Sequence, residues 1–359
     1  MVPPTVGIIA NPVSARDIRR IVAHAGNLQI TDRANIVLRI LAGLAYAGVE
    51  NVVMMPDRAG VRTYIERGLR RAASSGEGHF PALSFLDMPV MGTADDTVRA
   101  ARIMRKQDVS AIVVLGGDGT HRLVVRECGN IPISGVSSGT NNAFPTMAEP
   151  TITGLATGLS VRGLIPPSVA FFENKLLECR VNDLRDIALV DIAVVSDLFT
   201  GAKAVWRSGS LKELFTAFAF PHAIGLSAIS GLLSPVNREA PEGRQIRLKD
   251  STSGGVRLDV PLAPGLMAPV YVSGIEVLTP DNPASVCVQS GALALDGERE
   301  HIFNSEDHVT VTLRTAAFKT IDTNACMHYA ADKGLFTRPV SFEPEHASSV
   351  HNVHEQRQP

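Results

Sequence analysis

The feature that most constrains the fold is a short apolar run that ends in a glycine-rich turn. Residues 111–115 (AIVVL) are continuous in aliphatic side chains, which predicts a strand buried on both faces. The turn 116–120 (GGDGT) follows directly, and a helical pattern begins at His121. A buried strand that leads through a tight turn into a helix is typical of α/β proteins, so this stretch predicts a parallel sheet covered by helices.

Four residues of the turn suit the binding of a polyphosphate. Gly116, Gly117 and Gly119 lack Cβ atoms, so a phosphate can approach the backbone closely. The start of the following helix presents free N–H groups and a partial positive charge, and Thr120 can cap that helix or bind a phosphate oxygen. The turn is not a Walker A loop, since no GK[ST] follows. It is not GxGxxG either, because Arg122 stands at the third glycine position.

Asp118 is the residue that suggests chemistry rather than binding alone. A carboxylate among phosphate-binding glycines would repel its ligand unless it had a role. It could accept the proton of an attacking hydroxyl, or it could hold Mg²⁺ between phosphates. The alternative is that Asp118 only stabilises the tight turn, in which Asp and Gly are favoured.

The rest of the chain predicts two domains and a tail. Residues 1–165 alternate strand and helix patterns, which predicts a Rossmann-like parallel sheet with helices on both faces and its ligands at the carboxyl ends of the strands. Residues 166–335 contain many short strand patterns, one of them over 187–195, which predicts an all-β sandwich-like domain with one helical insertion over 210–233 and a helix before Gly334. Residues 336–359 lack periodicity and predict a flexible tail rather than a metal site, despite their histidines.

A second loop follows the next predicted strand, 131–136. It contains small, hydroxyl and amide side chains that could face the same crevice as the first turn, namely Ser138, Gly139, Thr140, Asn141 and Asn142. An ordinary polar turn is the alternative. Asn11 follows the first predicted strand, 5–10, and by itself is equally compatible with a simple turn.

Composition excludes several other classes of protein. Lys plus Arg number 34 and Asp plus Glu 36, so no basic surface for nucleic acid is expected, and the partners are small molecules. The four cysteines are far apart, which favours a reducing cytoplasm over a disulfide or zinc framework. Residues 215–233 are apolar but interrupted by Pro221, His222 and two glycines, so we expect no stable membrane insertion. A buried helix or a flap over a pocket remains open.

These motifs together resemble the superfamily of NAD kinases, diacylglycerol-type lipid kinases and sphingosine kinases. Asn-Pro at 11–12, GGDGT at 116–120 and GTNNAF at 139–144 occur in the family's order. In particular, the chain resembles the AcoX proteins, encoded with enzymes of acetoin catabolism. That resemblance is carried by GTNNAFP at 139–145, ALVD at 188–191, GAKAVW at 201–206 and LALDGERE at 293–300.

The resemblance implies an α/β domain and an all-β domain with the active site between them. It implies ATP and Mg²⁺ as cofactors, NAD as substrate and a homo-oligomer. Asp118 would be the general base, the glycines and Thr120 would bind the ATP phosphates, and Asn141 and Asn142 would belong to the second loop. Asp296 and Glu298 would help to place the metal or the nucleotide, although Asp296-Gly297 alone predicts only a hairpin turn.

One departure concerns the acceptor. NAD kinases usually carry Ala-Leu-Asn-Glu, whose polar pair grips the dinucleotide, whereas this chain has Ala188-Leu189-Val190-Asp191. Asp191 either takes over part of that role or faces a neighbouring strand. The leading hypothesis is phosphoryl transfer from ATP to the 2′-hydroxyl of NAD, giving NADP. The alternatives are a kinase of a lipid or small metabolite, and a non-catalytic nucleotide-binding regulator of acetoin catabolism.

Overall fold

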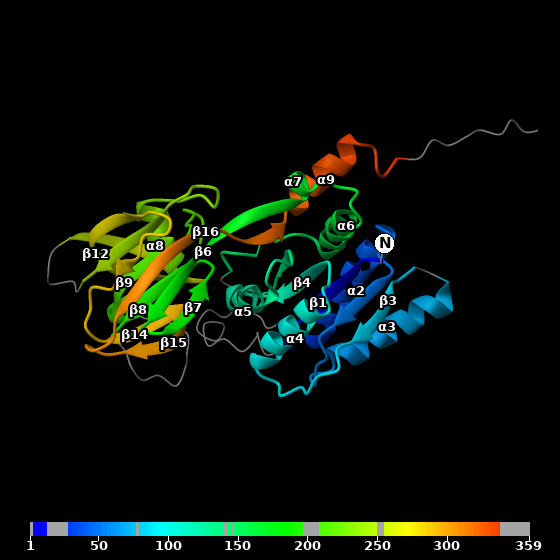
Figure 1. Ribbon diagram of the computed structural model, residues 1–359, viewed down its shortest axis with the longest axis horizontal. Coiled ribbons are helices and arrows are strands. Elements are labelled where there is room, and N and C mark those ends of the chain that lie inside the picture. The colour runs from blue at the N-terminus through cyan, green and yellow to red at the C-terminus, as the bar shows by residue number, and fades with distance from the viewer. Residues whose placement is uncertain are drawn as a thin grey trace, which may run out of the picture.

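Two lobes joined by two long strands make up the molecule (Figure 1). The structure, a computed structural model, describes residues 3–12, 28–76, 79–138, 142–145, 147–196, 208–249 and 255–337. Strands β6 (Phe171–Val181) and β16 (Val309–Ile321) are antiparallel partners that run from one lobe into the other. A register shift between Arg314 and Phe318 breaks their pairing into two segments.

The first lobe contains the predicted parallel sheet. Its strand order is β3-β2-β1-β4-β5, and β5 is followed by β16, β6 and β7. All pairings among the first five strands are parallel. Those strands are β1 (Thr5–Ile9), β2 (Asn51–Met54), β3 (Ala82–Phe85), β4 (Ala111–Gly116) and β5 (Ile133–Ser137). Strand β4, which lies between β1 and β5, is wholly buried, as its continuous apolar sequence predicts.

Helices cover both faces of this sheet, which confirms the predicted fold class. Successive side chains of a strand point to opposite faces. Val113 and Leu115 accordingly share a core with α2 and α3, whereas Ile112 and Val114 share one with α4 and α5. The helices of this lobe are α2 (Ile30–Tyr46), α3 (Val61–Ser75), α4 (Asp95–Lys106), α5 (Asp118–Cys128), α6 (Pro150–Val161) and α7 (Pro167–Ala170).

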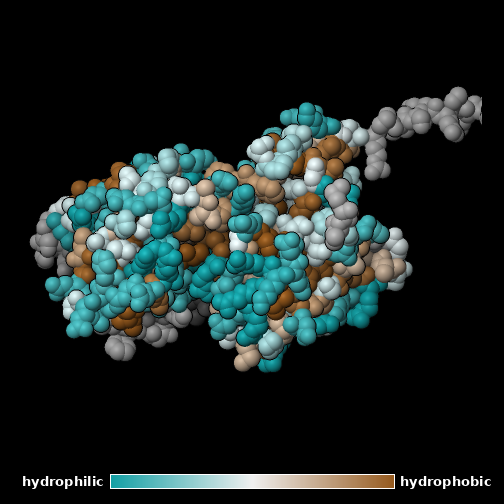
Figure 2. Space-filling view, viewed as in Figure 1, coloured by the Kyte–Doolittle hydropathy of each residue, from teal (hydrophilic) through white to brown (hydrophobic). Residues whose placement is uncertain are grey.

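The second lobe is a sandwich, again as predicted. A seven-stranded antiparallel sheet, in the order β11-β12-β10-β9-β8-β14-β15, shares one apolar core with β6, β7 and β16. Besides β6 and β16, the elements of the second lobe are β7 (Leu184–Ala188), β8 (Asp191–Val195), η2 (Ser208–Ser210), β9 (Leu211–Thr216), α8 (Ser227–Leu233), β10 (Gly243–Leu248), β11 (Val256–Ala263), β12 (Leu266–Leu278), β13 (Ala284–Ser285), β14 (Gly291–Leu295) and β15 (Glu298–Phe303). The same core continues into the first lobe, and Figure 2 shows hydrophobic residues where the lobes meet.

Two predicted elements of this lobe were wrong in detail. The helix predicted over 210–233 is limited to α8, because Leu211–Thr216 forms β9 in the middle of the second sheet. The sequence of β9, LKELFT, contains residues of high helix propensity, and pairing within a sheet overrides that weak local preference. The single strand predicted over 187–195 is two strands in different sheets, since the chain bends at Leu189 and Val190.

The last described helix returns to the first lobe. α9 (Thr323–Asp332) begins at Asp322, whose Oδ1 accepts the N–H of Ala325 at 2.9 Å, and it is followed by Gly334 with φ 64°. This confirms the predicted C-terminal helix. It packs on α6 and α7, so residues that the sequence groups with the β-rich domain contact the first lobe. The predicted tail from 338 onward lies outside the described residues.

Candidate active site

The GGDGT turn lies between the carboxyl end of β4 and the start of α5. Gly117 is the N-cap in extended conformation, and Asp118 is the first helical residue. A Cβ on Gly116 would lie 2.5 Å from the Thr120 side chain, and one on Gly117 would lie 2.8 Å from Oδ1 of Asn142. Thr120 therefore leaves no room for a Cβ at Gly116, whereas at Gly117 only the amide end of Asn142 would have to move. The strand-to-helix setting predicted for the turn is confirmed.

The second loop meets the first at the same edge of the sheet. Gly116 is paired with Ser137, and the N–H of Ser138 donates to the Gly116 carbonyl at 3.2 Å. Asn142 donates from Nδ2 to Oγ of Ser137 at 2.8 Å, which places its amide beside the first turn. The other candidates in this loop, Gly139, Thr140 and Asn141, lie outside the described residues.

Asp118 connects the two loops. Its Oδ2 accepts the N–H of Ala143 at 2.9 Å, and its Oδ1 accepts the N–H of Phe144 at 3.0 Å. The carboxylate therefore does more than stabilise its own turn, because both contacts bridge to a segment that follows the neighbouring strand β5. A charged acceptor with two amide donors is held in one orientation.

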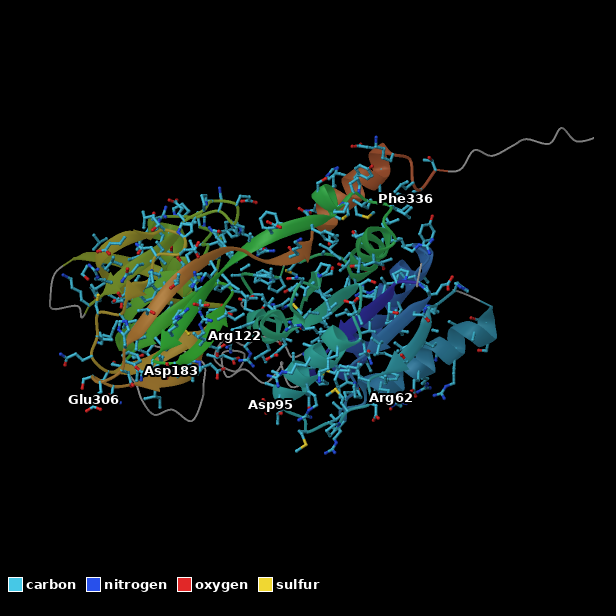
Figure 3. The ribbon with its side chains drawn as sticks, viewed as in Figure 1. Arg62, Asp95, Arg122, Asp183, Glu306 and Phe336 are labelled. Atoms are coloured by element: carbon cyan, nitrogen blue, oxygen red, sulfur yellow. The ribbon has the colours of Figure 1, made fainter. Side chains whose placement is uncertain are left out.

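Arg122, one helical turn after Asp118, ties α5 to the second lobe. Figure 3 labels this side chain at the junction of the lobes. The guanidinium is almost completely buried, donates from Nη2 to Glu300 at 2.9 Å, and lies 3.6 Å from Asp186 and 3.8 Å from Asp296. Burial alone would lower the pKa of Arg122, but the carboxylates, Asp296 foremost, raise it. The Arg122 guanidinium therefore stays protonated beside these carboxylates.

Asp296 forms the predicted hairpin turn and is buried beneath Arg122. Asp296 and Gly297 have φ of 49° and 80°, and they join β14 to β15. The Asp296 carboxylate accepts the N–H groups of Leu189, Val190 and Asp191 at 2.8–3.3 Å, and desolvation raises its pKa. These partners hold the turn against the start of β8, and the expected contact of Asp296 with metal or nucleotide stays a prediction.

Glu298 and Asp191 have different positions relative to the turn. Glu298 lies on the same hairpin as Asp296, and its carboxylate is 3.6 Å from the place a Cβ of Gly119 would occupy. The hairpin therefore delivers one carboxylate to the GGDGT turn. Asp191 is buried at the start of β8, and its carbonyl accepts the N–H of Asp296 at 2.9 Å. The backbone of Asp191 thus contacts the hairpin, and a role of its side chain toward substrate or metal stays a prediction.

Asn11 lies at the carboxyl end of β1, beside a small cavity. Its Nδ2 donates to the Thr93 carbonyl at 2.8 Å and to Oγ1 of Thr97 at 3.1 Å, so the buried side chain joins β1 to the start of α4. A cavity of about 200 Å³ adjoins it, lined also by Met55, Asp57, Arg58, Gly92 and Asp96. This is the edge of the sheet at which α/β proteins bind ligands.

Two residues near Asp118 gave no signal in the sequence. His121 is completely buried, its Nδ1 donates to the Gly117 carbonyl at 2.9 Å, and burial lowers its pKa to about 4. Arg238 reaches from the second lobe, and its guanidinium lies over the rings of Phe144 and Phe218 at 5.0 and 4.5 Å. Since Arg238 is 95 residues from Ala143 in sequence, no local pattern could have paired them.

The oxygen atoms around the turn fit a magnesium ion that arrives with a nucleotide. Within the described ranges, no group of three His, Cys, Asp or Glu side chains could hold a metal. Asp118, Glu298 and the Asn142 amide oxygen surround Gly117 and Gly119. Mg²⁺ is usually bound by one or two carboxylates together with phosphates and water, so these are the oxygen atoms that could hold it.

None of the helices in the described part of the chain is long and apolar enough to cross a bilayer.

Comparison with known proteins identifies both lobes. Residues 6–163 match the family model of the ATP-NAD kinase N-terminal domain, and residues 175–316 match that of the acetoin catabolism protein X C-terminal domain. The chain is 53% identical over 332 residues to acetoin catabolism protein X of Cupriavidus necator, covering 91% of this chain and 92% of that protein. A crystal structure of yeast NADH kinase complexed with NADH aligns with a TM-score of 0.43 and 13% identity, covering 94% of this chain and 90% of that one. The chain therefore belongs to the acetoin catabolism protein X family, with an N-terminal domain of the ATP-NAD kinase type.

Proposed function

We propose that the protein is an ATP-dependent phosphotransferase in which Asp118 accepts the proton of the acceptor hydroxyl. The observation that carries the proposal is the position of the Asp118 carboxylate, at the start of α5 and hydrogen-bonded to the second loop. The match to the ATP-NAD kinase N-terminal domain supports the class of reaction. Asn11 and its cavity, on the same edge of the sheet, are the proposed continuation of the nucleotide site.

The proposed mechanism needs positioning and charge stabilisation more than covalent chemistry. The bare backbone at Gly117 and Gly119 and the N–H groups at the start of α5 would hold the phosphates. Mg²⁺ bound with the nucleotide, near Glu298 and Asn142, would neutralise developing charge. A carboxylate oxygen can accept two hydrogen bonds, so the amide contacts of Asp118 are compatible with a hydroxyl donor.

NAD is the acceptor to test first, because the family model of the first lobe is that of ATP-NAD kinases. A second candidate is a different hydroxyl compound, and Val190 favours it. This residue stands where NAD kinases carry Asn, is buried, and has its N–H engaged by Asp296 at 2.8 Å. A polar grip on the dinucleotide is therefore missing at this position. The third candidate is a nucleotide-binding regulator without turnover.

The test is product analysis with purified protein, labelled ATP and Mg²⁺ against NAD, NADH, diacylglycerol and small diols. Asp118→Asn should lower kcat by about 10²–10⁴-fold, because an amide cannot accept the proton. The matched control is Asp183→Asn, an exposed residue of the β6–β7 hairpin, which should retain wild-type turnover. Full turnover by Asp118→Asn would refute the assigned role. Thermal stabilisation by ATP without any phosphorylated product would favour the regulator.

A further inference from the structure

Arg238 lies in the loop between α8 and β10 of the second lobe. Its hydrogen bonds, however, are with Ala143 and Phe144 of the first lobe, at the end of the second loop. We infer that Arg238, anchored by Lys175, is the positioning residue that holds residues 142–145 against Asp118. The inference rests on the proposed function for its catalytic meaning. The geometry itself is independent of any substrate.

A single peptide group connects Arg238 to Asp118. The carbonyl of Ala143 accepts Nη2 of Arg238 at 2.8 Å, and the N–H of the same peptide, on Phe144, donates to Oδ1 of Asp118 at 3.0 Å. A cation at the carbonyl polarises the peptide and strengthens its N–H as a donor, since hydrogen bonds in a chain reinforce one another. Nη2 of Arg238 also donates to the carbonyl of Phe144. Arg238 thus fixes the two residues whose amides orient the carboxylate.

Aromatic rings fix the plane of the guanidinium. Phe144 belongs to the second loop and Phe218 to the second lobe, and Arg238 lies over both rings. A planar guanidinium can stack on aromatic faces while it donates in its own plane, and a lysine ammonium cannot reproduce this combination. Coulombic attraction to Asp118 partly offsets the desolvation of Arg238. The side chain is therefore specific to arginine at this place.

Lys175 holds the loop that carries Arg238. This buried residue of β6 donates from Nζ to the carbonyls of Asn237, Ala240 and Glu242 at 2.8, 2.5 and 2.6 Å. An ammonium has three donors, and all three are used. The carbonyls lie on both sides of Arg238 in sequence, so the anchor leaves little freedom to the residue between them. Because β6 runs between the lobes, the anchor is part of their connection.

Hydrogen exchange at the amides of Ala143 and Phe144 tests the inference without any need for turnover. Arg238→Met should accelerate exchange at these two amides by about tenfold or more. Arg238→Lys should accelerate it less, because an ammonium keeps the charge but cannot stack on the rings or donate as a planar guanidinium does. The control Arg257→Met removes an exposed ion pair with Asp259 on β11 and should leave both amides unchanged. Exchange within about twofold of wild type in the Arg238 variants would overturn the inference. If Arg238→Met does not fold, Arg238→Lys decides.

Kinetics test whether Lys175 acts through Arg238. In the enzyme assay, Arg238→Met should lower kcat by about 10–100-fold with little change in KM for ATP, because orientation of Asp118 affects the chemical step. Lys175→Met should lower kcat less, and adding it to Arg238→Met should cost nothing further. If the two losses in kcat multiply in the double variant, Lys175 does not act through Arg238. If the wild type transfers no phosphate to any acceptor, the proposed function fails, while the exchange result still decides the role of Arg238.

Discussion

Two arginines connect the lobes near α5, and they differ in their partners. Arg122 is surrounded by carboxylates, namely Asp186, Asp296 and Glu300, and its pKa is raised in spite of burial. Arg238 is bound by neutral carbonyls and aromatic rings, and burial lowers its pKa. Both side chains reach across the lobes, but only Arg122 is neutralised by the residues that bind it.

The difference separates a structural cation from a positioning one. Removing one member of a buried group of opposite charges is strongly destabilising, because it leaves the other charges uncompensated. Arg238 is half-buried, has neutral carbonyl partners, and is linked to Asp118 through the hydrogen bonds of one peptide group. The two arginines therefore have different tasks at this junction. Arg122 fixes the lobes relative to each other, and Arg238 fixes the Asp118 carboxylate.

The largest expected effect is the loss of Arg122. Arg122→Met leaves three buried or partly buried carboxylates without their common partner, so the free energy of unfolding should fall by about 3–5 kcal/mol. Arg238→Met should cost less, about 1–3 kcal/mol, because it leaves only carbonyls unpaired. Denaturant titration measures both values. The control Arg102→Met removes an exposed pair with Glu127 and should have no measurable effect. A greater loss for Arg238→Met would reverse the comparison.

His121 sharpens the comparison through pH. Its pKa of about 4 in the folded protein lies below the ordinary 6.5, so between these values only the unfolded chain takes up a proton. The free energy of unfolding should therefore fall as the pH drops from about 6.5 to 4, by up to about 3 kcal/mol. His121→Asn keeps a donor for the Gly117 carbonyl but cannot titrate, and should show a flatter pH dependence. Equal slopes for the two proteins would contradict the assignment.

The same histidine reports on Arg238. Burial is the main cause of its low pKa, and the charge of Arg238 contributes to it. In Arg238→Met the pKa of His121 should therefore rise, whereas in Arg122→Met it should stay near its wild-type value. Titration by NMR measures both. An unchanged pKa in Arg238→Met would mean that the guanidinium does not act on this side of α5.

The smallest effects concern Gly117 and Gly119, the two glycines on either side of Asp118. A Cβ on Gly119 would make an ordinary contact with Glu298 at 3.6 Å, so Gly119→Ala should leave the free protein unchanged or stabilise it by about 0.5 kcal/mol. Gly117→Ala should destabilise it by about 1 kcal/mol, because Asn142 must move. Both should reduce the thermal stabilisation by ATP and Mg²⁺ if phosphates approach this backbone. Full stabilisation of Gly119→Ala would place the nucleotide elsewhere.

Much of the fold follows from local pattern. The run 111–115 predicts β4, the glycine turn predicts the start of α5, and Asp322 with Gly334 bounds α9. The contents of residues 210–233 were not predictable, since 211–216 (LKELFT) contains residues of high helix propensity and yet forms a strand. Whether β9 forms depends on the neighbours β8 and β10, which lie on both sides of it in the sheet.

The sequence by itself determined where the candidate ligand-binding turns occur, because strand ends and glycines are local features. Asp118 and the second loop were found in this way, and parallel pairing of β4 with β5 brings them together. Only the tertiary structure decided what orients them. Arg122 meets Asp296 and Arg238 meets Ala143 across separations of 174 and 95 residues. Contacts of this kind depend on the packing of two lobes, and neither residue type nor spacing encodes them.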